Sequence, residues 1–529
     1  MKDSKKHTGS YYTPAYLASF ISKRVLSYFE GRKRVSILEP SVGDGAFVTE
    51  LAKERNVNIN LTALDINGIE LKTASDKWNG KSASFEETDF LEFSTTKNYS
   101  AIVGNPPYVK KNILTSKQIH LSKKIHSEED LTEASVKNIW TTFLVKSNTL
   151  LAKNGVIAFV LPSELLQVKF AEEVREYLKN QFERIEIFTF NDLMFECKGQ
   201  DTIVLFAYKK SENKGEFFTN ITSKESLENN SFVLRNNQLL VSSKVKWTHH
   251  FLTTDELTFI DNLKGELKTV NDYSDSKPGI VTGANNYFII DRETEGKFNL
   301  SQYTKPIIQK GLYVNGSVVF DENDFKELEE SNRPTRLLQL NDNDKISKKL
   351  CEYLKIGELE EIPDRYKCRI RKNWYVIPNI SERPDAFFFK RSHLYPKLLK
   401  NNSNAFVTDS AYKVSMKSGF DLNSFIYSFY NTLTLLLSEL DGRYYGGGVL
   451  ELIPSEFKKL PIPYFEIEQN QFEKFTADYK NKSNIEQILN QNDFNILNSA
   501  LGMNYDNLKK LTEIRNKLKK KRLREYANT

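Results

Sequence analysis

The stretch from Ala101 to Val109 constrains the fold of this chain more than any other. It reads Ala-Ile-Val-Gly-Asn-Pro-Pro-Tyr-Val. The three apolar residues are typical of a buried parallel strand. Pro106 and Pro107 then end the strand, because proline holds φ at about −65° and has no backbone N–H to donate. The stretch therefore predicts an open α/β sheet, with a stiff polar loop at the carboxyl end of a strand, where ligands of such sheets bind.

This loop carries groups that suit a planar amine such as that of adenine. The lone pair of an exocyclic amine is delocalised into its ring, so the nitrogen is a poor nucleophile. The Asn105 side-chain oxygen and the Pro106 carbonyl can each accept one amine hydrogen. Tyr108 can stack on the base, a contact that contributes about 1–3 kcal/mol. These residues alone leave open an ordinary Asn-Pro-Pro turn with a core tyrosine.

Three polar turns earlier in the chain each follow a short predicted strand. They are Glu39-Pro40-Ser41-Val42-Gly43-Asp44-Gly45, Asp65 and Asp89-Phe90. Gly43 and Gly45 allow a ligand to approach the backbone closely. An acidic residue at the place of Asp65 commonly binds ribose hydroxyls, and Asp89 can accept from an adenine amine. The alternatives are tight packing turns and helix N-caps. Because the spacing is neither GxGxxG nor a P-loop, we expect a nucleoside-type ligand.

Thr13-Pro14 precedes all of these turns. A threonine followed by proline predicts a helix start, with Thr13 as N-cap and Pro14 at the first helical position. A helix N-terminus with a hydroxyl group also suits a carboxylate ligand. A plain capped surface helix is the other interpretation.

In this order the motifs resemble those of the gamma class of S-adenosylmethionine-dependent DNA methyltransferases, which modify adenine at N6. The resemblance implies that Thr13 lies near the methionine carboxylate of S-adenosyl-L-methionine and that Asp65 binds its ribose. It further implies a cofactor pocket lined by Glu39, Pro40, Gly43 and Gly45, with Asp89 and Phe90 at the adenine. The catalytic residues it implies are Asn105, Pro106, Pro107 and Tyr108, together with Phe195 beside the flipped-out base. For Phe195 a core position is the alternative.

The resemblance also implies an α/β fold class: a doubly wound, mostly parallel, seven-stranded methyltransferase sheet with a C-terminal mixed α+β target-recognition domain. The expected divisions are a catalytic domain at 1–215, a transition segment at 216–276, a recognition domain at 277–465 and a helical tail at 466–529. The implied partners are double-stranded DNA and a cognate restriction endonuclease acting on the same site. We expect a monomer.

Basic residues alternate with aromatic residues in two stretches of the second half. Arginine and lysine contact phosphates and read base edges, whereas a solvated basic face is the alternative for any single side chain. The candidates for DNA contact are Arg369, Arg371, Lys372, Lys390 and Arg391. The polar segment 110–137 predicts an irregular loop, and the basic run 517–522 predicts a frayed end or a phosphate contact.

The composition excludes several other classes. A formal net charge of +6 is compatible with a polyanion. Three cysteines without CxxC spacing predict neither a metal site nor a disulfide framework, and they fit a cytoplasmic protein. No apolar run approaches a membrane span, and Met1–His7 lacks the apolar region of an export signal. The alternatives within function are an RNA or protein-amide N-methyltransferase, a bifunctional restriction-modification enzyme, and a DNA-binding module without activity.

Overall fold

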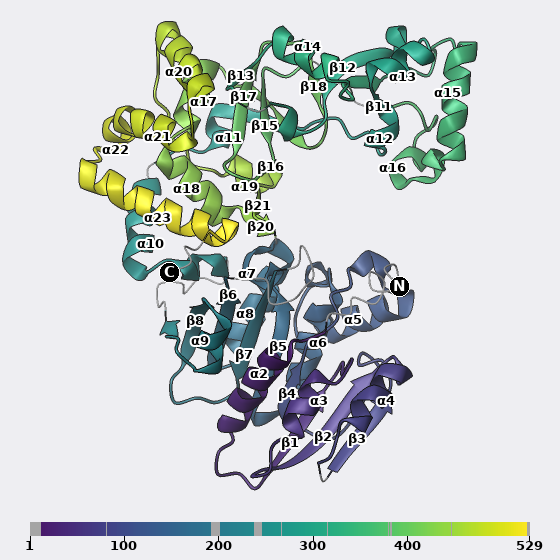
Figure 1. Ribbon diagram of the computed structural model, residues 1–529, viewed down its shortest axis with the longest axis vertical. Helices are drawn as coiled ribbons and strands as arrows, with labels where there is room; N and C mark the ends of the chain where they lie inside the picture. The colour runs from purple at the N-terminus through teal and green to yellow at the C-terminus, as the bar shows by residue number, and fades with distance from the viewer. Residues whose placement is uncertain are drawn as a thin grey trace. The chain divides into compact units, whose positions relative to one another are not determined.

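The computed structural model describes residues 12–80, 82–191, 201–236, 246–265, 267–314, 316–378, 380, 383–445 and 447–525. The chain divides into two compact units (Figure 1). Unit 1 holds Met1–Thr258, Tyr445–Gly447 and Arg524–Thr529, and unit 2 holds Phe259–Tyr444 and Gly448–Leu523.

Unit 1 is built on one large sheet. Its strands are β1 (Arg34–Glu39), β2 (Asn58–Asp65), β3 (Ser82–Glu87), β4 (Tyr99–Gly104), β5 (Leu151–Pro162), β6 (Arg184–Phe190), β7 (Thr202–Tyr208), β8 (Gly215–Ile221) and β9 (Arg235–Asn236). Their order is β3-β2-β1-β4-β5-β7-β6-β8-β9, and the first five run parallel. The predicted α/β class is confirmed, and all seven predicted strands are present.

The sheet is wider than predicted, with nine strands among the described residues. The two additional strands, β8 and β9, lie almost wholly within 216–276, a polar stretch that we expected to be a transition segment. The strand β8 nevertheless pairs in parallel with β6 along its whole length, and Phe218 and Ile221 are buried. Few apolar side chains suffice here because the strand lies towards the edge of the sheet.

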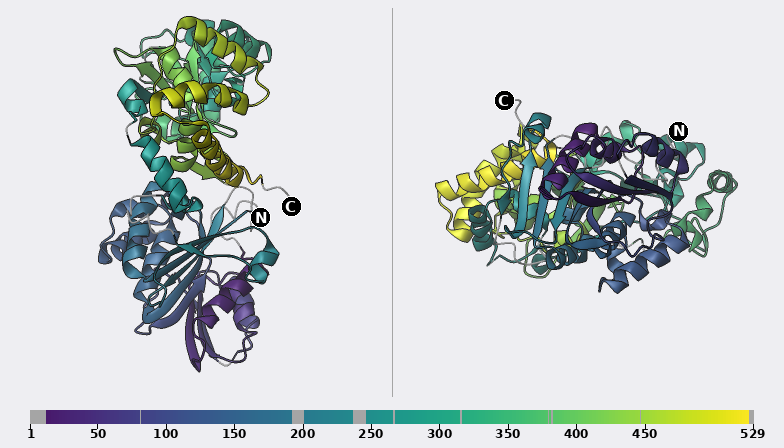
Figure 2. Two further views of the ribbon diagram at one scale, coloured as in Figure 1. Left: turned by 90° about the vertical axis from the view of Figure 1, so that its left-hand side faces the viewer. Right: turned by 90° about the horizontal axis from the view of Figure 1, so that it is seen from below.

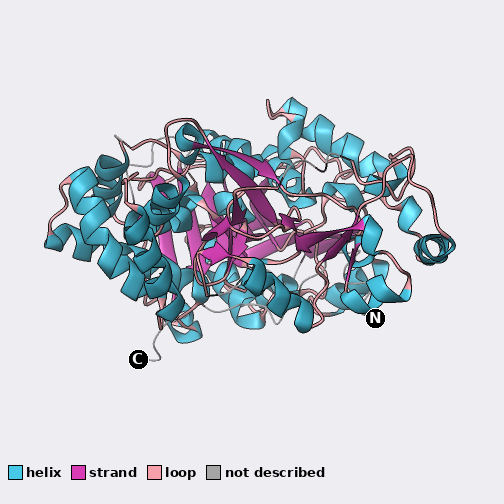
Figure 3. Cartoon of the chain, turned by 90° about the horizontal axis from the view of Figure 1, so that it is seen from above, coloured by secondary structure: helices cyan, strands magenta, loops and turns pink. Residues whose placement is uncertain are grey.

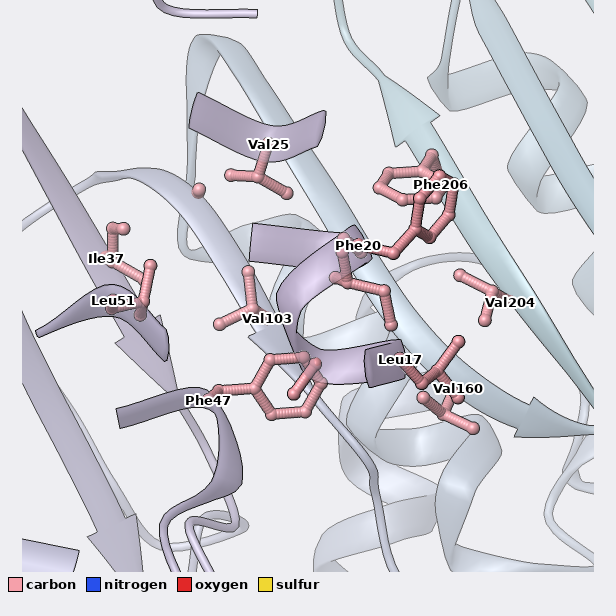
Figure 4. Packing of buried hydrophobic residues seen from close by; sticks show 14 of the residues in the cluster. Leu17, Phe20, Val25, Ile37, Phe47, Leu51, Val103, Val160, Val204 and Phe206 are labelled. Carbon is pink, nitrogen blue, oxygen red and sulfur yellow. The ribbon is translucent and has the colours of Figure 1, made fainter. Parts of the chain in front are cut away.

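Helices cover both faces of this sheet (Figure 2). They are α2 (Ala15–Ser27), α3 (Ala46–Leu51), α4 (Gly68–Asp76), α5 (Ser116–Glu128), α6 (Ile139–Thr149), α7 (Glu164–Gln167), α8 (Glu172–Gln181) and α9 (Lys224–Glu228). A further helix, α10 (Thr254–Lys264), begins in unit 1 and ends in unit 2. On one face Leu17 of α2, Phe47 of α3 and Val103 of β4 pack together (Figure 4). On the other face Ile102 of β4 packs with Trp140 of α6. Because the neighbouring residues Ile102 and Val103 enter opposite cores, the run from Ala101 to Val103 is apolar without interruption.

The segment 110–137 is helical, where the sequence predicted an irregular loop. Thr115 and Gln118 form a capping box at the start of α5. The buried His126 of α5 then links this helix to the turn Glu133–Ser135 and to α6. Its Nδ1 lies 2.7 Å from Ser135 Oγ and its Nε2 lies 3.2 Å from Thr142 Oγ1. These hydrogen bonds and a few apolar contacts hold the helix in place without a regular apolar stripe. The hydrophobic periodicity of the sequence therefore does not indicate the helix.

The apolar stripe from Trp140 to Leu151, followed by Asn154-Gly155, predicts a helix with a glycine C-cap, but α6 ends earlier than this. It ends at Thr149, and β5 begins at Leu151, so Gly155 lies inside a strand and does not cap a helix. The pairing of β4 with β5 shifts register between Tyr99 and Ala101. This irregularity accommodates Ala152–Gly155 within a strand, and a strand carrying a polar Asn-Gly pair resembles a helix end in sequence.

Unit 2 mixes helices with small sheets (Figure 3). Its strands are β10 (Ser274–Pro278), β11 (Ile289–Ile290), β12 (Thr304–Ile308), β13 (Val319–Phe320), β14 (Arg336–Leu338), β15 (Ala386–Phe389), β16 (Arg391–Ser392), β17 (Lys397–Asn401), β18 (Phe406–Val407), β19 (Ala411–Met416), β20 (Arg443–Tyr445) and β21 (Val449–Glu451). The largest sheet has the order β10-β19-β15-β17-β13. The predicted mixed α+β character is confirmed.

The helices of unit 2 gather mostly towards its C-terminal part. They are α11 (Val270–Tyr273), α12 (Asn285–Phe288), α13 (Arg292–Lys297), α14 (Glu322–Glu330), α15 (Lys348–Leu359), α16 (Tyr366–Arg369), α17 (Leu422–Phe429), α18 (Thr432–Asp441), α19 (Pro454–Lys458), α20 (Gln469–Asn481), α21 (Ile485–Asp493), α22 (Ser499–Leu501) and α23 (Tyr505–Leu523). In the part of the chain that the structure describes, none of the helices combines the length and apolarity that a membrane crossing requires.

The basic run at the end of α23 is packed at Arg522, where the sequence predicted fraying or a phosphate contact. The side chain of Arg522 is 2% exposed and donates to both oxygens of Glu439, each at 2.7 Å. It also donates to the His393 carbonyl at 2.6 Å. The prediction was wrong for this residue because Leu511 and Leu518 bury one face of α23 and carry Arg522 inward with them.

Candidate active site

The catalytic loop predicted from the sequence follows the carboxyl end of β4. The amide nitrogen Nδ2 of Asn105 donates to Thr13 Oγ1 at 3.2 Å, and the Tyr108 hydroxyl donates to Asn105 Oδ1 at 2.8 Å. The same hydroxyl lies 3.2 Å from the Val160 carbonyl oxygen, and Ser41 Oγ donates to the Asn105 carbonyl at 3.3 Å. These contacts orient the amide, with Oδ1 towards the tyrosine.

Thr13 is close to this loop but does not cap α2 as predicted. The N-cap residue is Pro14, with φ −57° and ψ 141°, and no side chain caps the helix. Extended backbone at Pro14 places the first helical residue at Ala15, one position later than a Thr-Pro start requires. The Thr13 hydroxyl is instead buried against Asn105, 92 residues away in sequence.

Carboxylates gather at the ends of β1 and β2. Glu39 is 1% exposed, and Oε2 of its carboxyl has no hydrogen-bond partner in the described structure. Burial raises the pKa of Glu39 well above its ordinary value, and the nearby Asp44 and Asp65 raise it further. Burial likewise raises the pKa of Asp44 and of Asp65. A cluster of this kind is suited to a cationic ligand.

Asp65 is fixed by the turn that it faces. Its Oδ2 accepts from the Gly43 N–H at 2.9 Å and its Oδ1 from the Asn67 N–H at 2.9 Å. Asn67 caps α4, so the alternative interpretation of Asp65 as the N-cap was wrong. Gly45 has φ +80°, and a Cβ there would lie 2.9 Å from Ala74 Cα. Only glycine fits this turn, which brings the backbone close to the site.

The turn after β3 contains Asp89 and Phe90. Phe90 is 1% exposed and packs against Phe143, with a ring-centroid distance of 4.9 Å. The Nζ of Lys146 in α6 stabilises this turn by donating to the backbone carbonyls of Leu91 at 2.8 Å and Phe93 at 2.7 Å. Burial lowers the pKa of Lys146 to about 8. Sequence reasoning assigned no role to Lys146, whose only signal was that it is the one charged residue of Ile139–Thr149.

The structure brings Thr13, Glu39, Asp65 and Asn105 to the carboxyl edge of the parallel strands, as predicted for motifs at strand ends. Pro40 and Pro106 are buried, and Pro107 is partly buried. The predicted Phe195 lies outside the described residues.

The five candidate DNA contacts in unit 2 occupy different environments. Arg369 and Lys372 are exposed. Arg371 donates to the backbone carbonyls of Thr282 at 2.7 Å and Trp374 at 3.2 Å, so its guanidinium holds two loops together. Lys390 lies 3.9 Å from Asp409, and Arg391 donates to Glu451 at 3.0 Å.

Two of these five residues, Arg371 and Lys372, help to line a groove of about 620 Å³. We call it the basic groove. It is lined by Pro278, Gly279, Ile280, Val281, Asp342, Lys367, Ile370, Arg371, Lys372, Asn373, Val376, Pro378 and Lys413. Ile370 is 62% exposed and Val281 is 43% exposed, so the groove combines cations with open aliphatic side chains.

Two family models match the chain, one on each part. The model described as Eco57I restriction-modification methylase matches residues 15–195, and the model described as Type II methyltransferase M.Eco57I, C-terminal domain, matches residues 244–497. Among curated proteins, Type II methyltransferase M.AccI of Acinetobacter calcoaceticus is 25% identical over 86% of this chain and 85% of its own length. Type II methyltransferase M.HincII of Haemophilus influenzae is 27% identical over 43% of each chain.

Among solved structures, the type IIL restriction-modification enzyme MmeI, determined in complex with DNA, is similar with a TM-score of 0.57. The match covers 95% of this chain and 75% of that chain at 12% identity, which bears on the fold alone. Family models of this kind match both parts of the chain, which is a methyltransferase of the restriction-modification type and uses S-adenosyl-L-methionine as its cofactor.

Proposed function

We propose that this methyltransferase acts on N6 of adenine at a specific site in double-stranded DNA, with the target base turned out of the helix. The observation that carries the proposal is the Asn105 amide, oriented by Thr13 and Tyr108 at the end of β4. Protection of host DNA beside a cognate restriction endonuclease is the proposed role, in a cytoplasmic, monomeric enzyme.

The residues at the strand ends fit the cofactor. The buried Glu39 has an oxygen without a partner in the described structure, and Asp44 and Asp65 lie near enough to raise its pKa. S-adenosyl-L-methionine supplies, when bound, an electrophilic methyl group on a positively charged sulfonium, together with an ammonium group. This acidic cluster complements such cationic groups, and the Asp65 carboxylate suits ribose hydroxyls.

The catalytic loop acts on the target amine by accepting its hydrogens. An amide oxygen has two lone pairs, so Asn105 Oδ1 can accept from the amine while it accepts from Tyr108. The Pro106 carbonyl accepts the second hydrogen, and the nitrogen lone pair becomes localised. Tyr108 stacks on the base and offsets the cost of extrusion, which is a few kcal/mol. Positioning and oriented dipoles supply the catalysis, so no cysteine nucleophile is required.

The basic groove supports a phosphate contact in unit 2. Lys372 is exposed on its rim, and Lys367 and Lys413 line it. For Lys372→Gln we expect the affinity for DNA to fall by a similar factor whatever the DNA sequence. We also expect the plot of log K against the logarithm of the salt concentration to become shallower by about one unit of slope. Fluorescence anisotropy across a salt series measures both quantities. The control is Lys349→Gln, at an exposed lysine paired with Glu352 and outside the groove. An unchanged slope for Lys372→Gln would exclude the contact.

Glu39→Gln tests the acidic cluster. The Glu39 carboxyl has a higher pKa in the folded protein than in the unfolded chain. The folded protein therefore loses stability as the pH rises from the ordinary pKa of the carboxyl towards its raised pKa. We therefore expect Glu39→Gln to raise the unfolding temperature of the cofactor-free protein by about 2–4 °C at pH 7.5, and to weaken cofactor binding. Differential scanning fluorimetry with and without S-adenosylhomocysteine measures both effects. The exposed Glu30→Gln is the control. A lower unfolding temperature for Glu39→Gln would contradict the proposal.

Long-read mapping of methylation tests the substrate. After incubation of the protein with unmethylated genomic DNA, we expect modified adenines within one short sequence and intact DNA strands. Methylation of RNA or of protein glutamine in place of DNA would overturn the proposal, and cleavage of the DNA would identify a bifunctional enzyme. Cofactor binding without transfer to any substrate would indicate a module without activity.

A further inference from the structure

The Asp89 carboxylate accepts a hydrogen bond from the side chain of Gln118, a residue that belongs to none of the motifs and has no part in the proposed mechanism. Its Oδ1 accepts from the Leu91 N–H at 2.9 Å within the turn, and its Oδ2 accepts from Gln118 Nε2 at 3.0 Å. Among the described residues, Gln118 is the only side chain that hydrogen-bonds this carboxylate. It comes from the first turn of α5, on the segment that follows the catalytic loop.

The orientation of the Gln118 amide is determined by its other end. Oε1 accepts from the Thr115 N–H and lies 3.2 Å from Thr115 Oγ1, which forms the capping box of α5. A carbonyl oxygen must face the N–H of Thr115, so the NH₂ group must face Asp89. The amide therefore acts as a rigid link between the helix start and the carboxylate.

We propose that Gln118 is a positioning residue that orients the Asp89 carboxylate to receive the exocyclic amine of the cofactor's adenine. The inference rests on the proposed role of Asp89 as the acceptor of that amine. A carboxylate oxygen accepts more than one hydrogen bond, so Oδ2 can hold Gln118 and the amine together. Without Gln118, the carboxylate can rotate about its χ2 bond, and within the described structure the Leu91 N–H is its one remaining hydrogen-bond donor.

Gln118→Glu separates this role from helix capping. Glutamate keeps an oxygen for the capping box, since it is a preferred residue at this position, but it removes the donor and places a second negative charge beside Asp89. The control is Lys117→Ala, on the same helix turn, which removes an exposed ion pair of 2.7 Å with Glu92. Circular dichroism and the unfolding temperature of each variant show whether the fold is retained.

The measurement is calorimetric binding of two ligands to the full chain. One is S-adenosylhomocysteine, and the other is its analogue with hydrogen in place of the 6-amino group. We expect wild type and Lys117→Ala to favour the first ligand strongly. In Gln118→Glu, the Kd of S-adenosylhomocysteine should rise about tenfold, while the Kd of the analogue stays nearly constant. A purely structural role would weaken both ligands alike.

The outcomes separate two failures. If wild type prefers the 6-amino ligand and Gln118→Glu keeps the same preference, the inference about Gln118 is overturned and the proposed role of Asp89 stands. If wild type binds both ligands equally, Asp89 does not receive the amine, and the assignment of Asp89 and the inference fall together. A DNA methylation assay with wild type then shows independently whether the proposed function holds.

Discussion

Replacing Asn105 by alanine should reduce methyl transfer by at least about a hundredfold, the effect typical of losing one oriented group at a reacting centre. The variant loses the oxygen that accepts an amine hydrogen and the 2.8 Å contact with the Tyr108 hydroxyl. It retains the carboxylates at the ends of β1 and β2. The loss should therefore appear in single-turnover transfer, and the Kd of S-adenosylhomocysteine should change by less than about threefold.

The matched control for Asn105→Ala is Ser41→Ala. Ser41 donates to the backbone carbonyl of Asn105 at 3.3 Å and does not contact its amide. We expect this variant to retain most of its turnover. Near-normal transfer by Asn105→Ala would contradict the assignment of the catalytic loop. If Asn105→Ala lost cofactor binding as well as transfer, the substitution would have disrupted the structure of the site. The isosteric variant Asn105→Asp would then be tested in its place.

Replacing Tyr108 by alanine should weaken capture of the extruded base. Loss of a stacked aromatic ring costs about 1–3 kcal/mol, which corresponds to about five- to 150-fold in affinity. Fluorescence of 2-aminopurine at the target position reports extrusion, so its increase on binding should be much smaller for this variant than for wild type.

Tyr108→Phe separates the ring from the hydroxyl. It keeps the stacking surface and removes the contacts of the hydroxyl with Asn105 Oδ1 and the Val160 carbonyl. We expect near-normal extrusion with slower transfer, because the Asn105 amide is then less well oriented. Undiminished 2-aminopurine fluorescence in Tyr108→Ala would exclude the stacking role.

The strand-end motifs could be predicted from sequence because their signals are local. A buried parallel strand is an uninterrupted apolar run, and its carboxyl end is marked by Gly43, Asp65 or Pro106 within a few residues. Since the carboxyl ends of parallel strands share one edge, the order of the motifs indicated their proximity. The structure shows this arrangement in the bond from the Gly43 N–H to Asp65 and in the bond from Ser41 Oγ to the Asn105 carbonyl.

Other features depend on partners far away in sequence, which local patterns do not reveal. The Thr-Pro pair suggested a cap, whereas the Thr13 hydroxyl meets Asn105. The basic end of α23 suggested a solvated tail, whereas Arg522 is paired with Glu439. Gln118 fits a capping pattern, but nothing local indicates its bond to Asp89. Arg371 was selected for its charge, and the structure shows that it also bonds backbone carbonyls.

The most direct test of the account is the identity of the methylated nucleoside. The purified protein is incubated with radiolabelled S-adenosyl-L-methionine and unmethylated duplex DNA, and the DNA is digested to nucleosides and separated. We expect label in N6-methyl-2′-deoxyadenosine with the wild-type protein, and no label with Asn105→Ala. Label in a methylated cytosine, or label in RNA or protein with none in DNA, would contradict it.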